Sequence, residues 1–370
     1  MKLVEVRNRK QLRQFITFPE KLYGNCPQWV APLRFDERNV LSSKNPAFDF
    51  CEAVYYLVVD DQDEVLGRIA GIINNLANKD WNEKTARFGW IDFVEDMDVL
   101  RLLMDGVSDW AKAKGMKYLK GPLGFTDMDK EGMLVEGFEH LSPITCIYNY
   151  PYYGPMLEQL GFCKDVDWTQ RLLMVPEEVP PIFEYADLVT RRFGVKLFEP
   201  KNNKELKSRG RQLFEVLNNS FVPLYEFTKL TDKQIDCYLD EYLPFVDKDY
   251  TCMVLNEKDE VVGFIICIPD LSHAFKKANG KLFPFGWAHI LHDLKHCTML
   301  EALMIGTLPE YQGKGASLLL LKHIVESCHK HGITMVRMNP QLEENNKVQS
   351  LFDQFEVRPF LRRRSYTKTL

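Results

Sequence analysis

The segment from Met299 to Cys328 most restricts how this chain can fold. It opens with an apolar run that predicts a strand, which Pro309 must end because proline has no N–H to give to a ladder. Gly313 and Gly315 then permit a tight turn. From Ala316 onward, apolar residues recur at helical spacing. The segment therefore predicts a strand, a glycine turn and an amphipathic helix.

A turn of this kind can bind an anion. Backbone N–H groups converge in glycine turns, and the first turn of a helix carries partial positive charge. A dinucleotide-binding turn would need Gly-x-Gly-x-x-Gly, and a P-loop would need Gly-x4-Gly-Lys-Ser/Thr. Neither pattern occurs in this segment. The turn predicts a phosphate site of another type, the alternative being an ordinary strand–turn–helix without a ligand.

The stretch from Thr307 to Ser317, Thr-Leu-Pro-Glu-Tyr-Gln-Gly-Lys-Gly-Ala-Ser, resembles motif A of the GNAT superfamily of N-acetyltransferases. It departs from the motif only mildly, because Ser317 stands where the family has Gly or Ala. In that family the loop amides hold the pyrophosphate of acetyl-CoA. The resemblance implies a site for acetyl-CoA or another acyl-CoA. Its expected residues are Ile305, Gly306, Thr307, Gln312, Gly313, Lys314, Gly315, Ala316, Ser317 and Asn345.

The resemblance also implies the catalytic groups. Glu301 lies on the strand that enters the motif, where the family often keeps a carboxylate base; the alternatives are a solvent-facing glutamate or one paired with a basic side chain. The backbone from Ile305 to Thr307 is expected to bind the acyl carbonyl. Asn345 matches an asparagine that contacts the pantetheine arm. Phe352 stands where the family often has the tyrosine that protonates the leaving thiolate, so the general acid is not identified.

An internal repeat defines the expected fold. Tyr55–Ile73 and Cys252–Ile268 both read as hairpins, and Asp-Glu-Val-Leu-Gly67 nearly repeats Asp-Glu-Val-Val-Gly263. A strand, a helix and a second strand follow each hairpin. We therefore expect an α/β (α+β) chain of two tandem GNAT-like domains, each a mixed, largely antiparallel sheet flanked by helices.

The two halves are not equivalent. The first has Glu-Asp-Met-Asp at residues 95–98 in place of the glycine turn, and three carboxylates would repel a pyrophosphate. Residues 1–175 are expected to form a degenerate GNAT-like domain, and residues 195–370 the domain with the acyl-CoA motif. Residues 176–194, which open with a proline-rich acidic stretch, are expected to form a linker with a short helix.

An irregular stretch from Gly121 to His140 interrupts the first half. It is acidic and punctuated by glycine, and long insertions of this type in compact domains are often functional. With the tyrosines that follow it, the stretch is expected to contact a cationic or amine-bearing acceptor. The alternative is a compact loop that only closes its own core.

Composition limits the partners. The net charge of −5 and the pI near 6.0 argue against a general nucleic-acid binder. There is no apolar stretch long enough to span a membrane and no apolar leader, so we expect no membrane partner. Nine scattered cysteines without a Cys-x-x-Cys pair favour a reducing, cytoplasmic location. Three histidines at 289, 292 and 296 lack companion ligands, so no metal site is expected.

These observations favour a bacterial tandem-GNAT protein that acts as an acyl-CoA-dependent N-acyltransferase, most simply an N-acetyltransferase. The acceptor is expected to be a small-molecule or peptide amine. The sequence leaves the acceptor, the acyl length and the oligomeric state open. Two alternatives remain: a CoA-binding regulatory protein without catalysis, and a Fem-like aminoacyl transferase.

Overall fold

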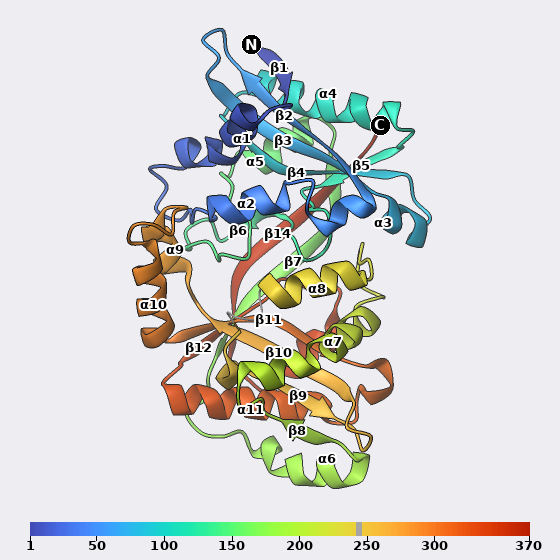
Figure 1. Ribbon diagram of the computed structural model, residues 1–370, viewed down its shortest axis with the longest axis vertical. Coiled ribbons are helices and arrows are strands. Elements are labelled where there is room, and N and C mark those ends of the chain that lie inside the picture. The colour runs from blue at the N-terminus through green and yellow to red at the C-terminus, as the bar shows by residue number, and fades with distance from the viewer. Residues whose placement is uncertain (242–245) are drawn as a thin grey trace. The chain divides into compact units, whose positions relative to one another are not determined.

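The computed structural model describes residues 1–241 and 246–370, which form two compact units that interleave along the sequence (Figure 1). Unit 1 comprises residues 1–169, 271–293 and 361–370, and unit 2 comprises residues 170–270 and 294–360. Each unit has a mixed sheet with helices packed on it, which confirms the predicted fold class.

The elements of unit 1 are β1 (Lys2–Glu5), α1 (Arg9–Leu22), α2 (Arg34–Val40), β2 (Cys51–Val59), β3 (Val65–Asn74), α3 (Asn75–Asp80), β4 (Thr85–Phe93), α4 (Met97–Ala113), β5 (Tyr118–Gly121), β6 (Met133–Glu136), α5 (Tyr153–Gln159) and α9 (Ser272–Ala278). Those of unit 2 are α6 (Ala186–Phe193), β8 (Lys196–Phe198), α7 (Asn203–Ser220), α8 (Asp232–Glu241), β9 (Thr251–Leu255), β10 (Val261–Pro269), β11 (Met299–Thr307), α11 (Ala316–His331), β12 (Met335–Met338), β13 (Gln341–Leu342) and α12 (Asn346–Gln349). Three elements contribute residues to both units: β7 (Cys163–Met174), α10 (Gly286–His296) and β14 (Val357–Thr369).

The two sheets follow the same plan. Their strand orders are β1-β2-β3-β4-β5-β14 in unit 1 and β8-β9-β10-β11-β12-β7 in unit 2. Neighbouring strands are antiparallel except for β4 with β5 and β11 with β12, which are parallel. The last strand of each sheet comes from the other half of the sequence. The predicted division into residues 1–175, a linker at 176–194 and residues 195–370 follows the repeat in the sequence, whereas the compact units exchange segments. That these parts are separate domains stays a prediction.

The hairpins β2–β3 and β9–β10 contain the same turn. Asp60 Oδ1 accepts the N–H groups of Gln62 and Glu64, both at 2.9 Å. Asn256 Oδ1 accepts the N–H groups of the equivalent residues, 258 and 260, at 2.9 and 3.0 Å. Three residues after the accepting side chain, an aspartate has a positive φ in both turns, 62° at Asp63 and 66° at Asp259. Similar sequences thus fold alike, which confirms the repeat.

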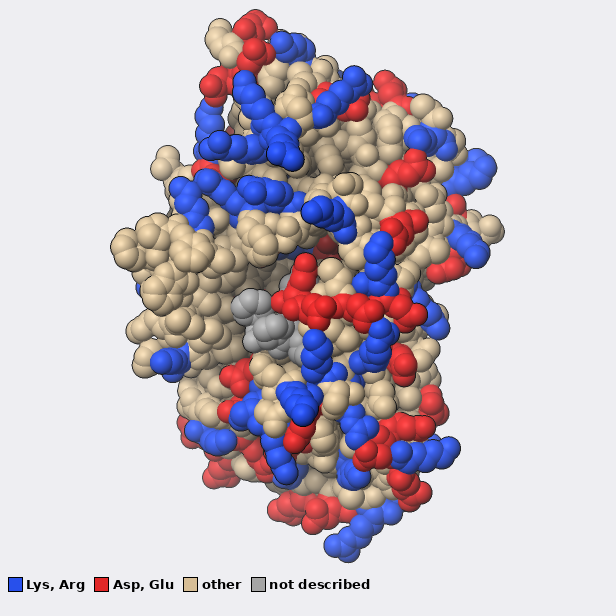
Figure 2. Space-filling model, in the orientation of Figure 1, with Lys and Arg blue, Asp and Glu red and all other residues tan. Residues whose placement is uncertain are grey.

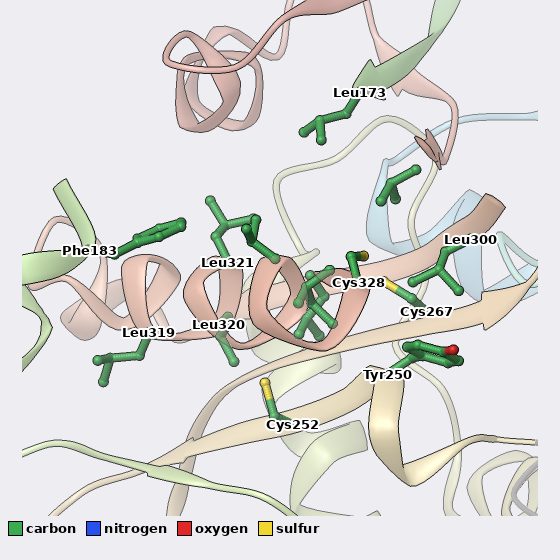
Figure 3. Packing of buried hydrophobic residues seen from close by; sticks show 14 of the residues in the cluster. Leu173, Phe183, Tyr250, Cys252, Cys267, Leu300, Leu319, Leu320, Leu321 and Cys328 are labelled. Carbon is green, nitrogen blue, oxygen red and sulfur yellow. The ribbon is translucent and has the colours of Figure 1, made fainter. Parts of the chain in front are cut away.

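Each unit packs one long helix on its central strands. In unit 1 a Cβ on Gly67 would lie 2.9 Å from both Val99 and Leu103, so the glycine in β3 lets α4 approach closely. In unit 2, buried residues of α11 such as Leu319, Leu320 and Cys328 pack beside Cys252 and the other side chains of one apolar cluster (Figure 3). This packing fixes the start of α11 at the end of β11.

Strand β14 stabilises unit 1 although it is the last strand in the sequence. Its residues Tyr366–Thr369 pair with β5, and the Tyr366 ring is buried. We predict that Tyr366→Ala lowers the free energy of unfolding by about 3–4 kcal/mol, because a large buried ring leaves a cavity. Urea denaturation measures this loss.

The matched control is Tyr366→Phe. It removes only the hydroxyl, which lies 3.4 Å from Glu158 Oε1, and should cost less than about 1 kcal/mol. Equal losses for the two variants would contradict the packing role of the ring.

Candidate acyl-CoA site

The site begins where β11 separates from β12. The two strands pair in parallel from Met299 with Met335 to Ala302 with Met338, and no further pairing between them follows in the described residues. At the same point the register of β11 against β10 shifts, so that Leu303 forms a β-bulge. Beyond the bulge, one edge of β11 faces β10 and the other edge no longer has a strand beside it.

The direction in which each peptide group points determines which N–H groups are available at the open edge of β11. The Leu308 N–H donates to the Val262 carbonyl of β10 at 2.9 Å. Because peptide groups alternate along a strand, Gly306 also faces β10 while Ile305 and Thr307 face the open edge. Asn339 Nδ2 donates to the Leu303 carbonyl at 2.7 Å, on the side where β12 has ended. The open edge therefore presents the Ile305 and Thr307 N–H groups, which can bind a carbonyl oxygen or an amide chain.

The glycine turn forms as predicted. Gly313 and Gly315 adopt left-handed φ values of 72° and 79°, which explains why glycine occupies both positions. Gln312 Nε2 approaches the Thr307 carbonyl at 3.4 Å, and the Lys314 ammonium lies 5.4 Å from the centre of the Tyr311 ring. Gln312, Gly313 and Lys314 are exposed, so the turn is accessible.

Helix α11 starts without a cap. Its N-cap residue is Gly315, and no side chain accepts from its first N–H groups. Among the described residues, the N–H groups of Gly313, Gly315, Ala316 and Ser317 have no hydrogen-bond partner. Four free amides and the positive end of a helix are suited to a pyrophosphate. The predicted residues 305–307 thus form the end of β11, and residues 312–317 form the glycine turn and the start of α11.

The equivalent helix of unit 1 is closed to an anion. Asp96 is the N-cap of α4, and its Oδ1 accepts the N–H groups of Asp98 at 2.8 Å and Val99 at 3.4 Å. A carboxylate therefore already occupies the place that a phosphate would take. This contrast supports the proposal that the first half does not bind acyl-CoA.

A tyrosine hydroxyl fills the corresponding strand edge of unit 1. Phe93 pairs with Gly67 as Thr307 pairs with Gly263, so the two positions are equivalent in the repeat. The Phe93 N–H donates to the Tyr153 hydroxyl at 3.0 Å. Tyr153 is fully buried, and burial raises its pKa well above its ordinary value, so this group stays a neutral hydroxyl. The amide that is open in unit 2 has a permanent partner in unit 1.

Glu301 is fully buried and paired. Its Oε2 lies 3.0 Å from a guanidinium nitrogen of Arg337, and the same nitrogen lies 2.7 Å from Asp270 Oδ1. Burial opposes the charge of Arg337, but the carboxylates of Glu301 and Asp270 outweigh it and raise the pKa of the guanidinium. Pairing with a basic side chain was one of the alternatives that the sequence left open. The role of Glu301 as a base stays a prediction.

Two further residues that the resemblance singled out follow β12 in the chain. Asn345 is the N-cap of the short helix α12, with its Oδ1 3.4 Å from the Val348 N–H. Its contact with a pantetheine arm stays a prediction. Phe352 is buried in the apolar cluster that holds α11. Its ring therefore serves the core and carries no group that could protonate a thiolate.

The stretch from Gly121 to His140 contains the strand β6, which pairs with β14, and a tight turn. Asp129 organises the turn, since its Oδ2 accepts the N–H groups of Phe125 at 2.8 Å and Thr126 at 3.1 Å. Burial raises the pKa of Asp129 to about 6. The loop is thus a folded, acidic part of unit 1, and its contact with an acceptor stays a prediction.

Within residues 1–241 and 246–370, no group of three or more His, Cys, Asp or Glu side chains is arranged to hold a metal ion. None of the helices in the described part of the chain could span a bilayer.

The comparisons with known proteins agree with this geometry. Residues 211–356 match the family model described as the acetyltransferase (GNAT) family. The fold of the whole chain is similar to that of a tandem GNAT protein from the clavulanic acid biosynthesis pathway, with a TM-score of 0.57 and 12% identity over 100% of this chain and 98% of that one. A GNAT protein from Sphaerobacter thermophilus is similarly related, with a TM-score of 0.53 and 11% identity over 99% and 95% of the two chains. Residues 211–356 thus match the GNAT family, and the whole chain has the predicted fold, which is similar to that of a tandem GNAT protein.

Two sequence relatives extend over most of the chain. Protein YghO of Escherichia coli strain K12 is 27% identical over 373 residues, which are 98% of this chain and 94% of YghO. The bacterial ceramide synthase of Caulobacter vibrioides is 26% identical over 305 residues, which are 80% of this chain and 77% of that protein. The family match and the similarity to a ceramide synthase support acyltransferase activity in general.

The sequence analysis missed the residues that support the site. Asn339 and the Arg337–Asp270 pair hold the strands where they separate, and Val189 of α6 packs against Gly315. Only Arg337 left a signal, because it is a single charge within an otherwise apolar strand. The other contacts join segments that are distant in sequence.

Gly313 allows the anion site to be tested without disturbing the core. A Cβ there would meet nothing within 4 Å, whereas a Cβ on Gly315 would lie 2.6 Å from Val189. We predict that Gly313→Asp weakens CoA binding at least ~10-fold, because a carboxylate beside a diphosphate repels it. Isothermal titration calorimetry measures the change.

Gly332→Asp is the matched control. Gly332 ends the same helix with a φ of 70°, and a Cβ there also meets nothing within 4 Å. Both variants should lose about 1 kcal/mol of stability from the left-handed backbone. Equal CoA affinity in the two variants would place the phosphate elsewhere.

The raised pKa of Asp129 predicts a dependence of stability on pH. Because its pKa is about 6 when folded and lower when unfolded, the folded chain holds this proton more tightly. Its contribution to stability therefore falls as pH rises from about 4 to about 6. Asp129→Asn keeps an oxygen for both N–H groups and removes the charge.

We expect Asp129→Asn to be more stable than the wild type at pH 7 by at least about 1 kcal/mol, since the variant does not have to bury a charged carboxylate. The two proteins should have similar stability at pH 4 in urea denaturation. An unchanged difference at both pH values would show that this carboxyl is not perturbed.

Proposed function

We propose that this protein transfers an acyl group from acyl-CoA, most simply acetyl-CoA, to the nitrogen of an amine. One observation carries the proposal: the free amides at the start of α11 lie directly after the open edge of β11 in the chain. The free amides at the start of α11 suit the pyrophosphate of CoA. The open edge of β11 suits the pantetheine arm and the thioester carbonyl. The family match over residues 211–356 supports the same ligand.

The chemistry follows from this placement. A neutral amine attacks the thioester carbon, a C–N bond forms, and the C–S bond breaks to release the CoA thiolate. The N–H groups of Ile305 and Thr307 would stabilise the oxyanion that develops on the carbonyl oxygen. The proton lost by the amine goes to a base and the thiolate gains one from water, because Phe352 offers no proton.

We propose Glu301 as the group that accepts the proton, through water, although Arg337 holds it in the ligand-free chain. Geometry before ligand binding does not exclude a base, since such contacts often form only in the complex. The rival view is that Glu301 and Arg337 only keep β11 and β12 in register, and it is favoured by their complete burial. The two views predict different kinetics.

Glu301→Gln keeps an acceptor for Arg337 but removes the charge. If Glu301 is the base, we expect kcat per folded molecule to fall about 10²–10⁴-fold while the Kd for acyl-CoA changes little. Glu310→Gln, at an exposed glutamate of the motif A turn, should change neither. A loss of activity that only tracks a loss of folded protein would assign Glu301 a structural role.

The acceptor class is proposed from a relative. A ceramide is an amide of a fatty acid and a long-chain amino alcohol, and this chain resembles a bacterial ceramide synthase over 80% of its length. Turnover should therefore be assayed with long-chain amino alcohols as well as with small amines and peptides, using acetyl-CoA and long acyl-CoA. Release of free CoA that depends on the amine would support transfer.

A CoA-binding protein without catalysis is the second candidate, because Phe352 lacks a hydroxyl and Glu301 is paired. It would be indicated by tight CoA binding without turnover on any amine. No observation in the described residues favours an aminoacyl transferase; binding of aminoacyl-tRNA without binding of CoA would be needed to support one.

A further inference from the structure

The segment from Leu271 to Asp293 belongs to unit 1 although it lies between β10 and β11 in the sequence. The Lys276 ammonium anchors it by donating to the carbonyls of Cys26 at 2.6 Å and Trp29 at 2.7 Å. The Arg34 N–H at the start of α2 donates to the Gly280 carbonyl at 3.2 Å. These bonds hold the segment against α2 and the chain before it.

The part of this segment beyond Gly280 exposes large apolar side chains. Phe283 is 78% exposed, Phe285 72%, Trp287 47% and Leu291 50%. Trp287 Nε1 donates to the Pro284 carbonyl at 2.8 Å, so the one polar group of the indole already has a hydrogen-bond partner. Figure 2 shows a largely uncharged surface over α9 and α10, on the left of the view. We name these four side chains the aromatic patch.

Phe35 of α2 enlarges the apolar surface nearby. It is 59% exposed and directly follows Arg34, which contacts Gly280. The largest apolar patch that a soluble protein exposes is often a functional surface. The aromatic patch is therefore a candidate binding surface.

Cations lie next to the aromatic patch in the sequence. Lys277, Lys281 and, on α2, Arg38 are exposed, and their charged groups have no hydrogen bond or ion pair with the described residues. Two carboxylates, Asp36 and Asp293, are close in sequence and reduce the local positive charge. Apolar contacts should thus supply most of any binding, and the cations should select an anionic partner.

We propose that the aromatic patch is a membrane-docking surface, which places its rings among the headgroups of an anionic phospholipid bilayer while Lys277 and Lys281 contact phosphates. Trp and Phe side chains with flanking lysines are typical of interfacial binding. The four side chains expose on the order of 400–600 Å², less than the roughly 800 Å² per partner of a stable protein interface. Because a membrane does not need to be complementary in shape, a patch of this size suffices for it.

This inference does not depend on the proposed function. The sequence analysis gave no reason to expect a membrane partner, because it found no segment that could cross a bilayer; the proposal departs from that expectation, since the aromatic patch would lie on the bilayer surface. Docking there would also suit a long-chain amine acceptor, since such molecules dissolve in membranes.

The test is sedimentation of the full chain with vesicles of neutral phosphatidylcholine and with vesicles that also contain phosphatidylglycerol. The wild type should bind the anionic vesicles more tightly, and added salt should reduce the difference. Phe283→Ser with Phe285→Ser should weaken binding at least ~10-fold. Lys277→Glu with Lys281→Glu should remove the preference for anionic vesicles.

Tyr185→Ser with Leu188→Ser is the matched control, because these side chains are 59% and 55% exposed on unit 2. It should leave vesicle binding unchanged, as should Gly313→Asp. Absence of wild-type binding, or equal binding by the Phe283/Phe285 variant, would overturn the proposal. A wild-type dimer that the same variant converts to a monomer would instead assign the aromatic patch to contact between copies. Calorimetry with CoA reports on the acyl-CoA site alone. It therefore distinguishes a failure of the docking proposal from a failure of the acyl-CoA site.

Discussion

The site depends on the separation of β11 from β12. Parallel pairing holds the strands as far as Ala302 and Met338, and the buried Glu301–Arg337–Asp270 cluster lies at that end of the ladder. A buried ion pair is costly to form and far more costly to break, so the cluster fixes where the strands part. Past this point a bulge and the side chain of Asn339 keep the edge open. An amide edge inside a folded domain is unusual unless a ligand uses it.

The two halves show how one fold gains or loses a ligand. Both contain the same hairpin, the same parallel pair and a helix that starts after it. In unit 2 the β-bulge and the end of β12 leave the strand edge open, and the glycine turn leaves the helix start open. In unit 1 Asp96 caps the helix and Tyr153 accepts the strand N–H, so the chain supplies its own substitutes for the ligand. The open site of unit 2 and the closed site of unit 1 thus differ in only a few residues. Each of these residues acts by leaving a backbone amide free or by occupying it.

Much of the fold and of the candidate site could be predicted from the sequence, because the residue patterns that encode them are local. The glycine turn, the helix from Ala316 and the repeated hairpin are each encoded within about twenty residues, where spacing and turn residues are informative. The pairing of Glu301 could be predicted only as one of several alternatives, since its partner Arg337 is 36 residues away in the sequence. The exchange of β7 and β14 between the sheets left no local signal. Such contacts are decided by packing of the whole chain.

The central claim is that this chain has one acyl-CoA site, formed by β11 and the start of α11. Isothermal titration calorimetry of the full chain with CoA tests it most directly, because the measurement gives affinity and stoichiometry together. We predict saturable binding of one CoA per chain. Two sites per chain would contradict the closure of unit 1, and no binding would show that the glycine turn is only a turn.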